Sequence, residues 1–424
     1  MPGVSPVGRR IAVSKHTQNP PVKSMPTWEA LEEWLRGEIG NRIQSVIEEE
    51  VNQFLGREWY ERRSAVDASA GYRNGYGKPR RLSTSCGTIQ IRRPRVRNVE
   101  ERFESRILPL FARRTKEVGQ LLPELYLHGL SQGDFELALR GLLGDGAPLS
   151  PASIGRLRAK WVADHQDWKE RRLDGRELVY AWADGIYVKA GLEKDKACLL
   201  VVIGAMSDGR KEVLALAPGY RESTESWLEV LRDLRDRGLE QPVLIAADGN
   251  MGIWAAVDQV WPESKQQRCW NHKIINVLDK IPKRTQAEAR TLLVQIPYAD
   301  TRQEAEKLQK RFAARYRSQF PKAVDALERD WDRMITFYDL PKEHWKHLRT
   351  TNIVESPFAS VRLRTNAAKR YKKVANATAL IWRTLMVAET RFRKLDAPHI
   401  LKDVYARKQY KDGIVVSLGN TMAA

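Results

Sequence analysis

The sequence predicts a protein of the mixed α/β class, in which a mixed sheet and a long all-helical stretch follow a mainly helical region with a small β-hairpin. Unbroken apolar runs of strand length gather between residues 177 and 270, as expected for strands buried on both faces. Helical spacing of apolar residues dominates before and after that segment. The chain has 424 residues, of which 42% are hydrophobic, which is enough for more than one domain with a packed core.

The charge balance points to a polyanionic partner. The 72 Lys and Arg exceed the 53 Asp and Glu by 19, and nucleic acid is the commonest polyanion in a cytosol. The longest apolar run, Ala197–Met206, is too short to span a membrane, and the first ten residues have no signal-peptide core. Three well-separated cysteines cannot form a disulfide framework. We therefore expect a cytoplasmic protein with no membrane partner.

An arm and a long helix are predicted first. Residues 1–26 lack apolar periodicity and are expected to be flexible. Residues 27–66 form a predicted amphipathic segment, in which Thr27 is a suitable N-cap, apolar residues recur at helical spacing as far as Leu55, and Gly56 stands where a C-cap belongs. The apolar stripe fits a helix packed on its own domain and a helix that pairs two subunits equally well.

Residues 67–112 form a predicted basic β-hairpin region. Turn signals at Asn74-Gly75 and Cys86-Gly87 flank two alternating stretches, Arg81–Ser85 and Thr88–Arg92. The window 71–98 has eight basic residues and no acidic one, which favours contact with DNA phosphates over a solvated edge strand. The basic residues are Arg73, Lys78, Arg80, Arg81, Arg92, Arg93, Arg95 and Arg97.

Residues 113–172 are predicted to form a helical DNA-binding region. Helices are expected at Asp134–Leu143 and from Pro151 to about Lys169, the second with Ser150 as its N-cap. The second helix carries Arg156, Arg158 and Lys160, which fits a helix-turn-helix. Because the connection is longer than the usual three or four residues, a plain helical hairpin is the alternative.

A mixed sheet is predicted within residues 173–278. A crossover helix, Ser223–Arg237, is expected before the last strand. The four predicted strands are Leu178–Ala183, Ala197–Met206, Lys211–Ala217 and Pro242–Ala247.

Helical spacing returns after the sheet. Residues 279–348 are predicted to be helical throughout, and a last helical region runs from Thr351 toward Ala388 within residues 349–396. Residues 397–424 are assigned to a C-terminal tail.

Three carboxylates carry the predicted chemistry. Asp184 and Asp248 each end an apolar run and precede a glycine, and Glu355 lies at the start of a helix. Two neighbouring strands that end in Asp bring two carboxylates to one end of the sheet, where burial is costly unless a cation compensates. An Asp-Gly pair also commonly starts a turn. The three acids together form a hard oxygen donor set that suits Mg²⁺ or Mn²⁺, and two such ions promote phosphoryl transfer.

These motifs resemble the Mutator-family transposases of bacterial insertion sequences, a DDE group with an RNase H-like catalytic domain. The resemblance covers about residues 60–390 and implies Asp184, Asp248 and Glu355 as the metal-binding triad. It also implies an RNase H-like core in residues 173–278 and 349–396, interrupted by a helical insertion at 279–348. The segments that carry it are Gly71–Gly75, Asp184–Lys189, Ala247–Gly252, Gln267–His272, Thr351–Ser356 and Arg362–Thr365.

The Cys269-x-x-His272 pair belongs to the same resemblance, which places it in the active-site surroundings with Arg268 as support. We expect His272 to lie close to the triad and to contact the scissile phosphate or orient a carboxylate. A buried structural histidine is one alternative. A zinc site shared with His344-x-x-His347 is another, because Cys and His are tetrahedral zinc ligands.

The resulting hypothesis is a DNA transposase that binds terminal inverted repeats, cleaves DNA with a metal-activated water and catalyses strand transfer by the 3′-hydroxyl. Two Mg²⁺ or Mn²⁺ ions per active site are expected. The partners are double-stranded DNA of the element ends and the target, and a second or further copy of the chain. Basic residues after Glu355 would neutralise phosphates: Arg362, Arg364, Lys369, Arg370, Lys372 and Lys373.

Other activities are less well supported by the sequence. It has no phosphate-binding glycine-rich loop, so no nucleotide cofactor is expected. Two alternatives to the transposase stay open: an RNase H-like nuclease or resolvase without strand transfer, and a non-catalytic DNA-binding regulator. When bound to DNA, the protein would associate with the nucleoid of a bacterial cell.

Overall fold

The computed structural model describes residues 27–61, 71–108, 112–130, 134–144, 151–191, 196–219, 221–249, 251–368 and 370–416. The chain forms two compact units. Unit 1 is Met1–Leu121 with Glu136–Leu149, and unit 2 is Leu122–Phe135 with Ser150–Ala424. The predicted arm, the helix cap Ser150 and the basic Lys369 lie outside the described residues.

Unit 1 is built on the long helix α1 (Trp28–Leu55), whose predicted caps are confirmed. Thr27 accepts a hydrogen bond from the Ala30 amide at 3.3 Å, and Gly56 ends the helix at a φ of 65°. Only its second half is buried, where Ile47, Val51 and Leu55 face the core of this unit. Larger apolar side chains of the first half are exposed: Trp28, Leu31, Trp34 and Leu35.

Four short strands of unit 1 form two antiparallel pairs. The predicted hairpin is confirmed as β2 (Arg80–Thr84) with β3 (Gly87–Ile91), turning at Ser85-Cys86. The turn predicted at Asn74-Gly75 is wrong, because both residues belong to β1 (Tyr72–Tyr76), which pairs with β4 (Pro94–Arg97). The register shifts between Arg73 and Tyr76, and Gly75 has a φ of 61°. The Asn-Gly pair therefore makes a bulge inside a strand.

The helices between the hairpins and the central sheet agree with the predictions where they are described. They are α2 (Lys116–Leu127), α3 (Phe135–Leu143) and α4 (Pro151–Glu170). The connection at 145–150, on which the helix-turn-helix prediction depends, lies outside the described residues. Helix α4 packs against α15 (Val374–Glu389), with the Trp168 and Trp382 rings 6.0 Å apart.

Unit 2 is centred on a five-stranded mixed sheet of order β7-β6-β5-β8-β9. Strands β5 (Leu178–Val188), β6 (Ala197–Met206) and β7 (Lys211–Gly219) are antiparallel neighbours, while β8 (Leu244–Ala247) and β9 (Lys265–Arg268) run parallel to β5. The strands β5, β7 and β8 therefore point the same way, and their carboxyl ends lie at one edge of the sheet.

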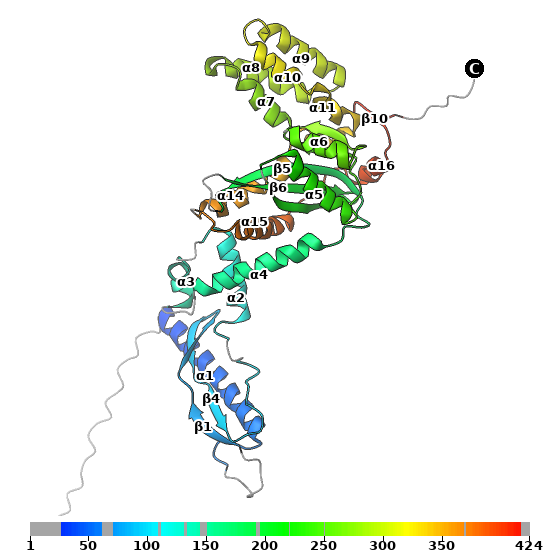
Figure 1. Ribbon diagram of the computed structural model, residues 1–424. Coiled ribbons are helices and arrows are strands. Elements are labelled where there is room, and N and C mark those ends of the chain that lie inside the picture. The colour runs from blue at the N-terminus through cyan, green and yellow to red at the C-terminus, as the bar shows by residue number, and fades with distance from the viewer. Residues whose placement is uncertain are drawn as a thin grey trace, which may run out of the picture. The chain divides into compact units, whose positions relative to one another are not determined.

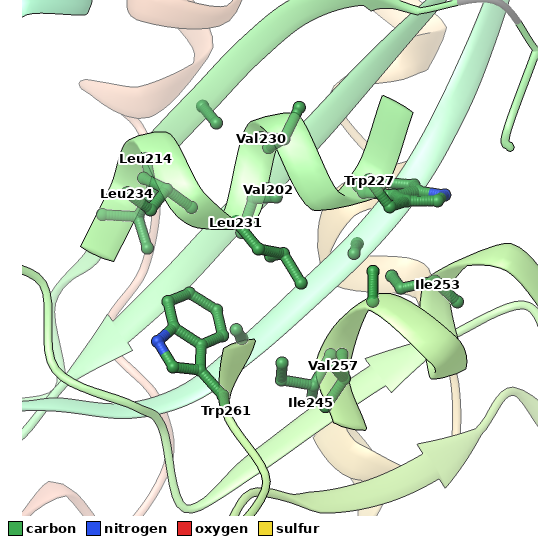
Figure 2. Close-up of a cluster of buried hydrophobic side chains, with 14 of the residues drawn as sticks. Val202, Leu214, Trp227, Val230, Leu231, Leu234, Ile245, Ile253, Val257 and Trp261 are labelled. Carbon is green, nitrogen blue, oxygen red and sulfur yellow. The ribbon is translucent and has the colours of Figure 1, made fainter. Parts of the chain in front are cut away.

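One face of the sheet is covered by α5 (Thr224–Asp236) and α6 (Met251–Val260). Figure 2 shows Trp227 of α5 above Ile253 of α6, and Leu231 of α5 pointing toward Val257 of α6 and Ile245 of β8. The α5 caps, Ser223 and Arg237, fall at the predicted helix ends. The apolar residues whose helical spacing predicts the crossover helix are therefore the residues on its buried face.

The other face of β5 is covered by the last residues of the helical stretch and the residues directly after it. Tyr180 pairs its hydroxyl with Nδ1 of His344 at 2.9 Å, and the Trp182 indole donates to the His347 carbonyl at 2.9 Å. The short helices α12 (Trp345–Leu348) and α13 (Asn352–Glu355) belong to this cover, and α13 contacts β5 and β6.

Residues 279–348 contain helices and no strand, as predicted. After α7 (Trp270–Leu278) they are α8 (Lys283–Gln295), α9 (Arg302–Tyr316), α10 (Pro321–Glu328), α11 (Trp331–Ile335) and α12, with single turns at Ile296–Tyr298, Thr336–Asp339 and Lys342–His344. Figure 1 shows α8, α9 and α10 gathered on one side of α6, and α11 contacts β9, the last strand of the sheet.

The last predicted helical region is broken into α13, α14 (Phe358–Asn366) and α15. The break between α14 and α15 has a physical cause. The Tyr371 amide donates to the Lys189 carbonyl, and the Tyr371 carbonyl accepts from the Gly191 amide, both at 2.9 Å. The backbone there bonds to the end of β5 instead of to its own helix. After Pro398–Ile400 the described chain ends with α16 (Leu401–Tyr405) and the hairpin of β10 (Tyr410–Lys411) and β11 (Ile414–Val415).

Candidate active site

Asp184 lies in the middle of β5, not at its end. The predicted end at Ala183 is wrong, because β6 pairs with β5 along its whole length, including Asp184 with Val201 and Val188 with Ala197. Side chains alternate along a strand, so Asp184 shares a face with Tyr180 and Trp182. That face is the one covered by residues 344–355.

Asp248 follows β8 directly and lies beside Asp184. Ala183 of β5 pairs with Ala247 of β8 in parallel register, so the next residue of each strand is an aspartate. Gly249 comes next with a φ of 100°, and a Cβ there would overlap the Arg268 side chain. The prediction that neighbouring strands bring Asp184 and Asp248 together is therefore confirmed.

A third carboxylate, Glu222, joins these two. One carboxylate oxygen from each of Asp184, Glu222 and Asp248 lies within 4.8 Å of the others. Glu222 precedes the N-cap of α5 and is only 9% exposed. Sequence analysis missed it, because an acid before an N-cap is typical of exposed helix starts. The available signal was its place after β7, a strand that runs in the same direction as β5 and β8.

The electrostatics of this cluster fit a divalent cation. Burial, opposed by a 2.8 Å hydrogen bond from the Gly185 amide and assisted by the charges of Glu222, Asp248 and Glu355, raises the pKa of Asp184 to about 7. Without a positive charge nearby, the Asp184 carboxylate is only half ionised at neutral pH. A bound metal ion would supply that charge and favour the ionised form. All the donors are hard oxygens, as Mg²⁺ and Mn²⁺ prefer.

Glu355 ends α13 and belongs to a second group with Cys269 and His272, whose ligand atoms also lie within 4.8 Å of one another. The structure thus places the third residue of the predicted triad beside the Cys-x-x-His pair. Its charge still acts on Asp184. The Thr351 hydroxyl donates a hydrogen bond to the Glu355 carboxylate and holds it at the helix end.

Cys269 joins the two groups through its backbone and its sulfur. Its amide donates to the Ala247 carbonyl at 2.8 Å, and its buried Sγ accepts from the Thr351 amide at 3.3 Å. The residue before Asp248 and the start of the Glu355 helix are therefore held by one residue, Cys269.

His272, in the first turn of α7, faces Glu355 with Nδ1 3.9 Å from the carboxylate. The Cys269 side chain, followed by the charges of Glu355 and Asp248 and opposed by burial, raises the pKa of His272 to about 9. The imidazole is therefore a cation at neutral pH. His344 and His347 lie elsewhere, the first against Tyr180 and the second 3.7 Å from Asp396, so the described residues do not form the alternative zinc site.

The basic residues after Glu355 divide by exposure. Arg362, Arg370, Lys372 and Lys373 are exposed, and Arg370 donates to the Gly191 carbonyl at 2.9 Å. Arg364 is only 2% exposed and stacks on the Tyr126 ring, 3.9 Å from its centroid. The expectation that Arg364 contacts DNA conflicts with this burial, which makes it a packing residue of unit 2.

The basic residues of the N-terminal half also divide by exposure. Arg80 donates to the Ala112 carbonyl, Arg93 to the Phe103 carbonyl and Arg73 to the Arg57 carbonyl, so these three hold unit 1 together. Arg158 of α4 is half-buried. The side chains that are exposed are Lys78, Arg81, Arg92, Arg95, Arg97, Arg156 and Lys160.

Among the residues that the structure describes, none of the helices combines the length and the apolar character that a bilayer-spanning helix needs.

Comparison with known proteins agrees with this arrangement. Residues 13–394 match the model of the family described as "Transposase, Mutator family". The chain is 43% identical over 296 residues to a transposase for insertion sequence element IS6120 from Mycolicibacterium smegmatis, covering 70% of this chain and 92% of that protein. It is also 43% identical over 290 residues to a transposase for IST2 from Acidithiobacillus ferrooxidans (66% and 96%), and 30% identical over 362 residues to one for IS406 from Burkholderia multivorans (83% and 90%). The chain therefore belongs to the Mutator family of transposases.

Proposed function

We propose that this transposase moves an insertion sequence by a DDE mechanism, in which one metal centre serves both cleavage of the element ends and strand transfer by the freed 3′-hydroxyl. The observation that carries the proposal is the parallel pairing of Ala183 with Ala247, which sets the Asp184 and Asp248 carboxylates within 4.8 Å of each other, with the charge of Glu355 acting on Asp184. The family membership of the chain supports DNA as the substrate.

The fold of the centre supports an RNase H-like core. The first three strands in sequence are antiparallel neighbours and the next two run parallel to the first, in the order β7-β6-β5-β8-β9. Helices α8 to α12 separate this sheet in sequence from the helix that carries Glu355. This is the organisation that the resemblance implies for the catalytic domain and its helical insertion.

Each residue of the centre has a proposed role. Asp184, Asp248 and Glu355 hold two Mg²⁺ or Mn²⁺ ions, which when bound supply activation of the attacking oxygen and stabilisation of the leaving oxygen. His272, a cation beside Glu355, orients that carboxylate and offers positive charge to the scissile phosphate. The exposed Arg362, Lys372 and Lys373 bind the DNA backbone after the Glu355 helix.

The remaining partners follow from the same proposal. The exposed basic side chains of unit 1 bind the terminal inverted repeats, and Arg156 and Lys160 of α4 also bind DNA. Joining two ends in one event requires at least two copies of the chain, so the active assembly is a homodimer or a larger oligomer. The protein works in the cytoplasm, on the nucleoid.

The proposal is tested with amide variants of the triad. Asp184→Asn, Asp248→Asn and Glu355→Gln should each abolish cleavage of a DNA fragment that carries the element ends, while gel-shift binding to the same fragment stays within about twofold. Asp208→Asn, an exposed acid in the turn after β6, is the matched control and should cleave normally. Retained cleavage in any triad variant would reject the assignment. A pre-nicked end separates a transposase from a nuclease, because only a transposase joins it to target DNA.

A further inference from the structure

Glu222 occupies a position equivalent to that of Asp248 but on another strand. Asp248 follows β8, and Glu222 follows β7 after a short turn in which Arg221 has a φ of 56°. Because β7 and β8 both run in the direction of β5, both residues reach the same edge of the sheet. The Glu222 carboxylate ends within 4.8 Å of those of Asp184 and Asp248.

Two glycines leave the space that Glu222 occupies. A Cβ on Gly185 would lie 2.8 Å from the carboxyl carbon of Glu222, and a Cβ on Gly252 would lie 2.8 Å from the carbonyl carbon of Ser223. Any side chain at these positions would push Glu222 or its backbone away. Gly185 is inside a strand and Gly252 inside a helix, where glycine is unfavourable unless another group approaches closely. The close approach of Glu222 accounts for both.

The position of Glu222 is costly in the absence of a cation. Its charge adds to the repulsion at Asp184, and after burial it is the next cause that raises the pKa of Tyr187 and of Cys198, the latter to about 12. A glutamate whose only role was to stabilise the start of α5 would do so equally well in solvent. Glu225 of the same helix has such a position, exposed in the first turn. Glu222 instead turns toward two other carboxylates, an arrangement that a divalent ion stabilises.

We propose that Glu222 is a fourth carboxylate ligand of the metal centre, in addition to Asp184, Asp248 and Glu355. The inference rests on the proposed function, because it assigns a further ligand to the same centre. It predicts that the cluster of Asp184, Glu222 and Asp248 binds one ion with three protein carboxylates.

The test measures metal binding directly, in the full-length protein without DNA. Isothermal titration with Mn²⁺ and the electron paramagnetic resonance signal of free Mn²⁺ give affinity and stoichiometry for the wild type, Glu222→Gln, Glu222→Asp and the control Glu225→Gln. We expect Glu222→Gln to weaken the tightest Mn²⁺ affinity at least tenfold and Glu222→Asp, which keeps the charge on a shorter side chain, to weaken it less. Glu225→Gln should bind as the wild type does.

Thermal unfolding provides the folding control and a second readout. Without metal, Glu222→Gln should melt cooperatively and above the wild type, because one repelling charge is gone, and added Mn²⁺ should raise its melting temperature less than that of the wild type. Wild-type affinity and stoichiometry in both Glu222 variants would overturn the inference. If Glu222→Gln does not fold, the test depends on Glu222→Asp alone. Wild-type Mn²⁺ affinity in that variant would then overturn the inference.

The outcomes for this inference and for the proposed function are separate. Wild-type Mn²⁺ binding by the Glu222 variants, together with loss of cleavage in the triad variants, leaves the DDE assignment standing and removes only Glu222 from the centre. Cleavage by the triad variants removes the DDE assignment itself, whatever the Mn²⁺ affinity of Glu222→Gln.

Discussion

Arg268 binds Asp330 through a nearly buried ion pair, with Nη1 2.8 Å from the carboxylate, and donates from Nε to the Asp248 carbonyl at 3.3 Å. Asp330 starts α11 in the helical stretch, with a φ of 57°. Gly249 leaves room for the guanidinium, because a Cβ there would overlap it. The ion pair therefore links the loop of a proposed metal ligand to the helices that follow the sheet, and it makes Arg268 a positioning residue.

Breaking this pair should cost both stability and activity. Arg268→Ala leaves the nearly buried Asp330 carboxylate with only its longer ion pair to Arg333, at 3.6 Å, and we expect a loss of about 3 kcal/mol in the free energy of unfolding. Urea unfolding at pH 7 measures it. Arg317→Ala is the control, since Arg317 pairs with Asp325 and Glu328 at the surface, where such pairs contribute about 1 kcal/mol or less. Equal losses in the two variants would contradict the buried role.

The positioning role has a readout that stability alone does not move. Arg268→Lys keeps a cation near Asp330 but lacks the fork that reaches the Asp248 carbonyl as well. We expect this variant to cleave at least tenfold more slowly at saturating DNA, with unchanged DNA affinity and a melting temperature closer to that of the wild type than that of Arg268→Ala. A wild-type cleavage rate would show that the contact with Asp248 does not position it.

The stability of the metal-free protein should fall as the pH rises from about 4 to about 7. The pKa of Asp184 is about 7 in the folded chain, above its ordinary value, so the folded state holds this proton more tightly than the unfolded state. The stabilisation is complete below pH 4 and is lost as the pH rises through 7, with an upper bound of about 4 kcal/mol. Asp184→Asn should remove this pH dependence and melt above the wild type at pH 8 in EDTA.

Metal addition provides the complementary measurement at the same site. At pH 8, Mg²⁺ should raise the melting temperature of the wild type and leave that of Asp184→Asn nearly unchanged. A variant that gains as much as the wild type would show that Mg²⁺ stabilises the protein at another place.

The pKa of His272 should depend more on Cys269, three residues earlier in the chain, than on the nearby carboxylate of Glu355. The Cys269 side chain is the largest cause that raises the pKa of His272 to about 9, and Glu355 contributes less. Cys269→Ala should therefore lower this pKa further than Glu355→Gln, as measured by NMR titration of the imidazole in metal-free protein. The reverse order would show that Glu355 dominates. The stabilisation from protonated His272 is complete below pH 6.5 and is lost as the pH rises through 9.

Activity tests the proposed role of the same imidazole. We expect His272→Gln to cleave DNA ten to a hundredfold more slowly while its affinity for the element ends stays unchanged. His272→Ala with wild-type strand transfer would instead assign the histidine to structure.

Two arginines on α14 form a matched pair for DNA binding. Arg362 is exposed and Arg364 is buried against Tyr126. Arg362→Ala should reduce the slope of log affinity against log salt concentration by about 1 with no change in unfolding. Arg364→Ala should lose about 2 kcal/mol of stability and leave the salt slope unchanged. If Arg364→Ala instead reduced the salt slope, Arg364 would have to leave its pocket to bind DNA.

Elements with a continuous local pattern could be predicted nearly to the residue. Strand β6 is an unbroken apolar run, and α1 has a capping threonine and glycine at its ends. Strand β5 was predicted too short, since Asp184-Gly185 has the composition of a turn and only pairing with β6 extends the strand past it. Strand β9 was missed, because its sequence, Lys-Gln-Gln-Arg, has no apolar pattern and its place is set by pairing with β8.

The candidate site was predictable to the extent that short motifs fix it. Asp184 and Asp248 follow from apolar strands ending near acids, and Glu355 follows from its place at a predicted helix start and from the family resemblance. Glu222 had no motif, and its approach depends on space left by Gly185 and Gly252 on other elements. The burial of Arg364 could not be predicted from the sequence either, because Tyr126, on whose ring it stacks, belongs to a helix more than 200 residues earlier in the chain.

The order of the elements along the chain also sets an order in time. During synthesis, β5 to β9 emerge before the helical stretch, with Asp184, Glu222 and Asp248 already among them, and the helices from α8 to α12 come before Glu355. Segments that emerge early can pack before the rest of the chain is made. A nascent chain that still lacks α13 has an assembled sheet without Glu355, and a centre that needs this residue stays inert until translation has passed it. With the proposed triad, the transposase is therefore inactive for most of its own synthesis.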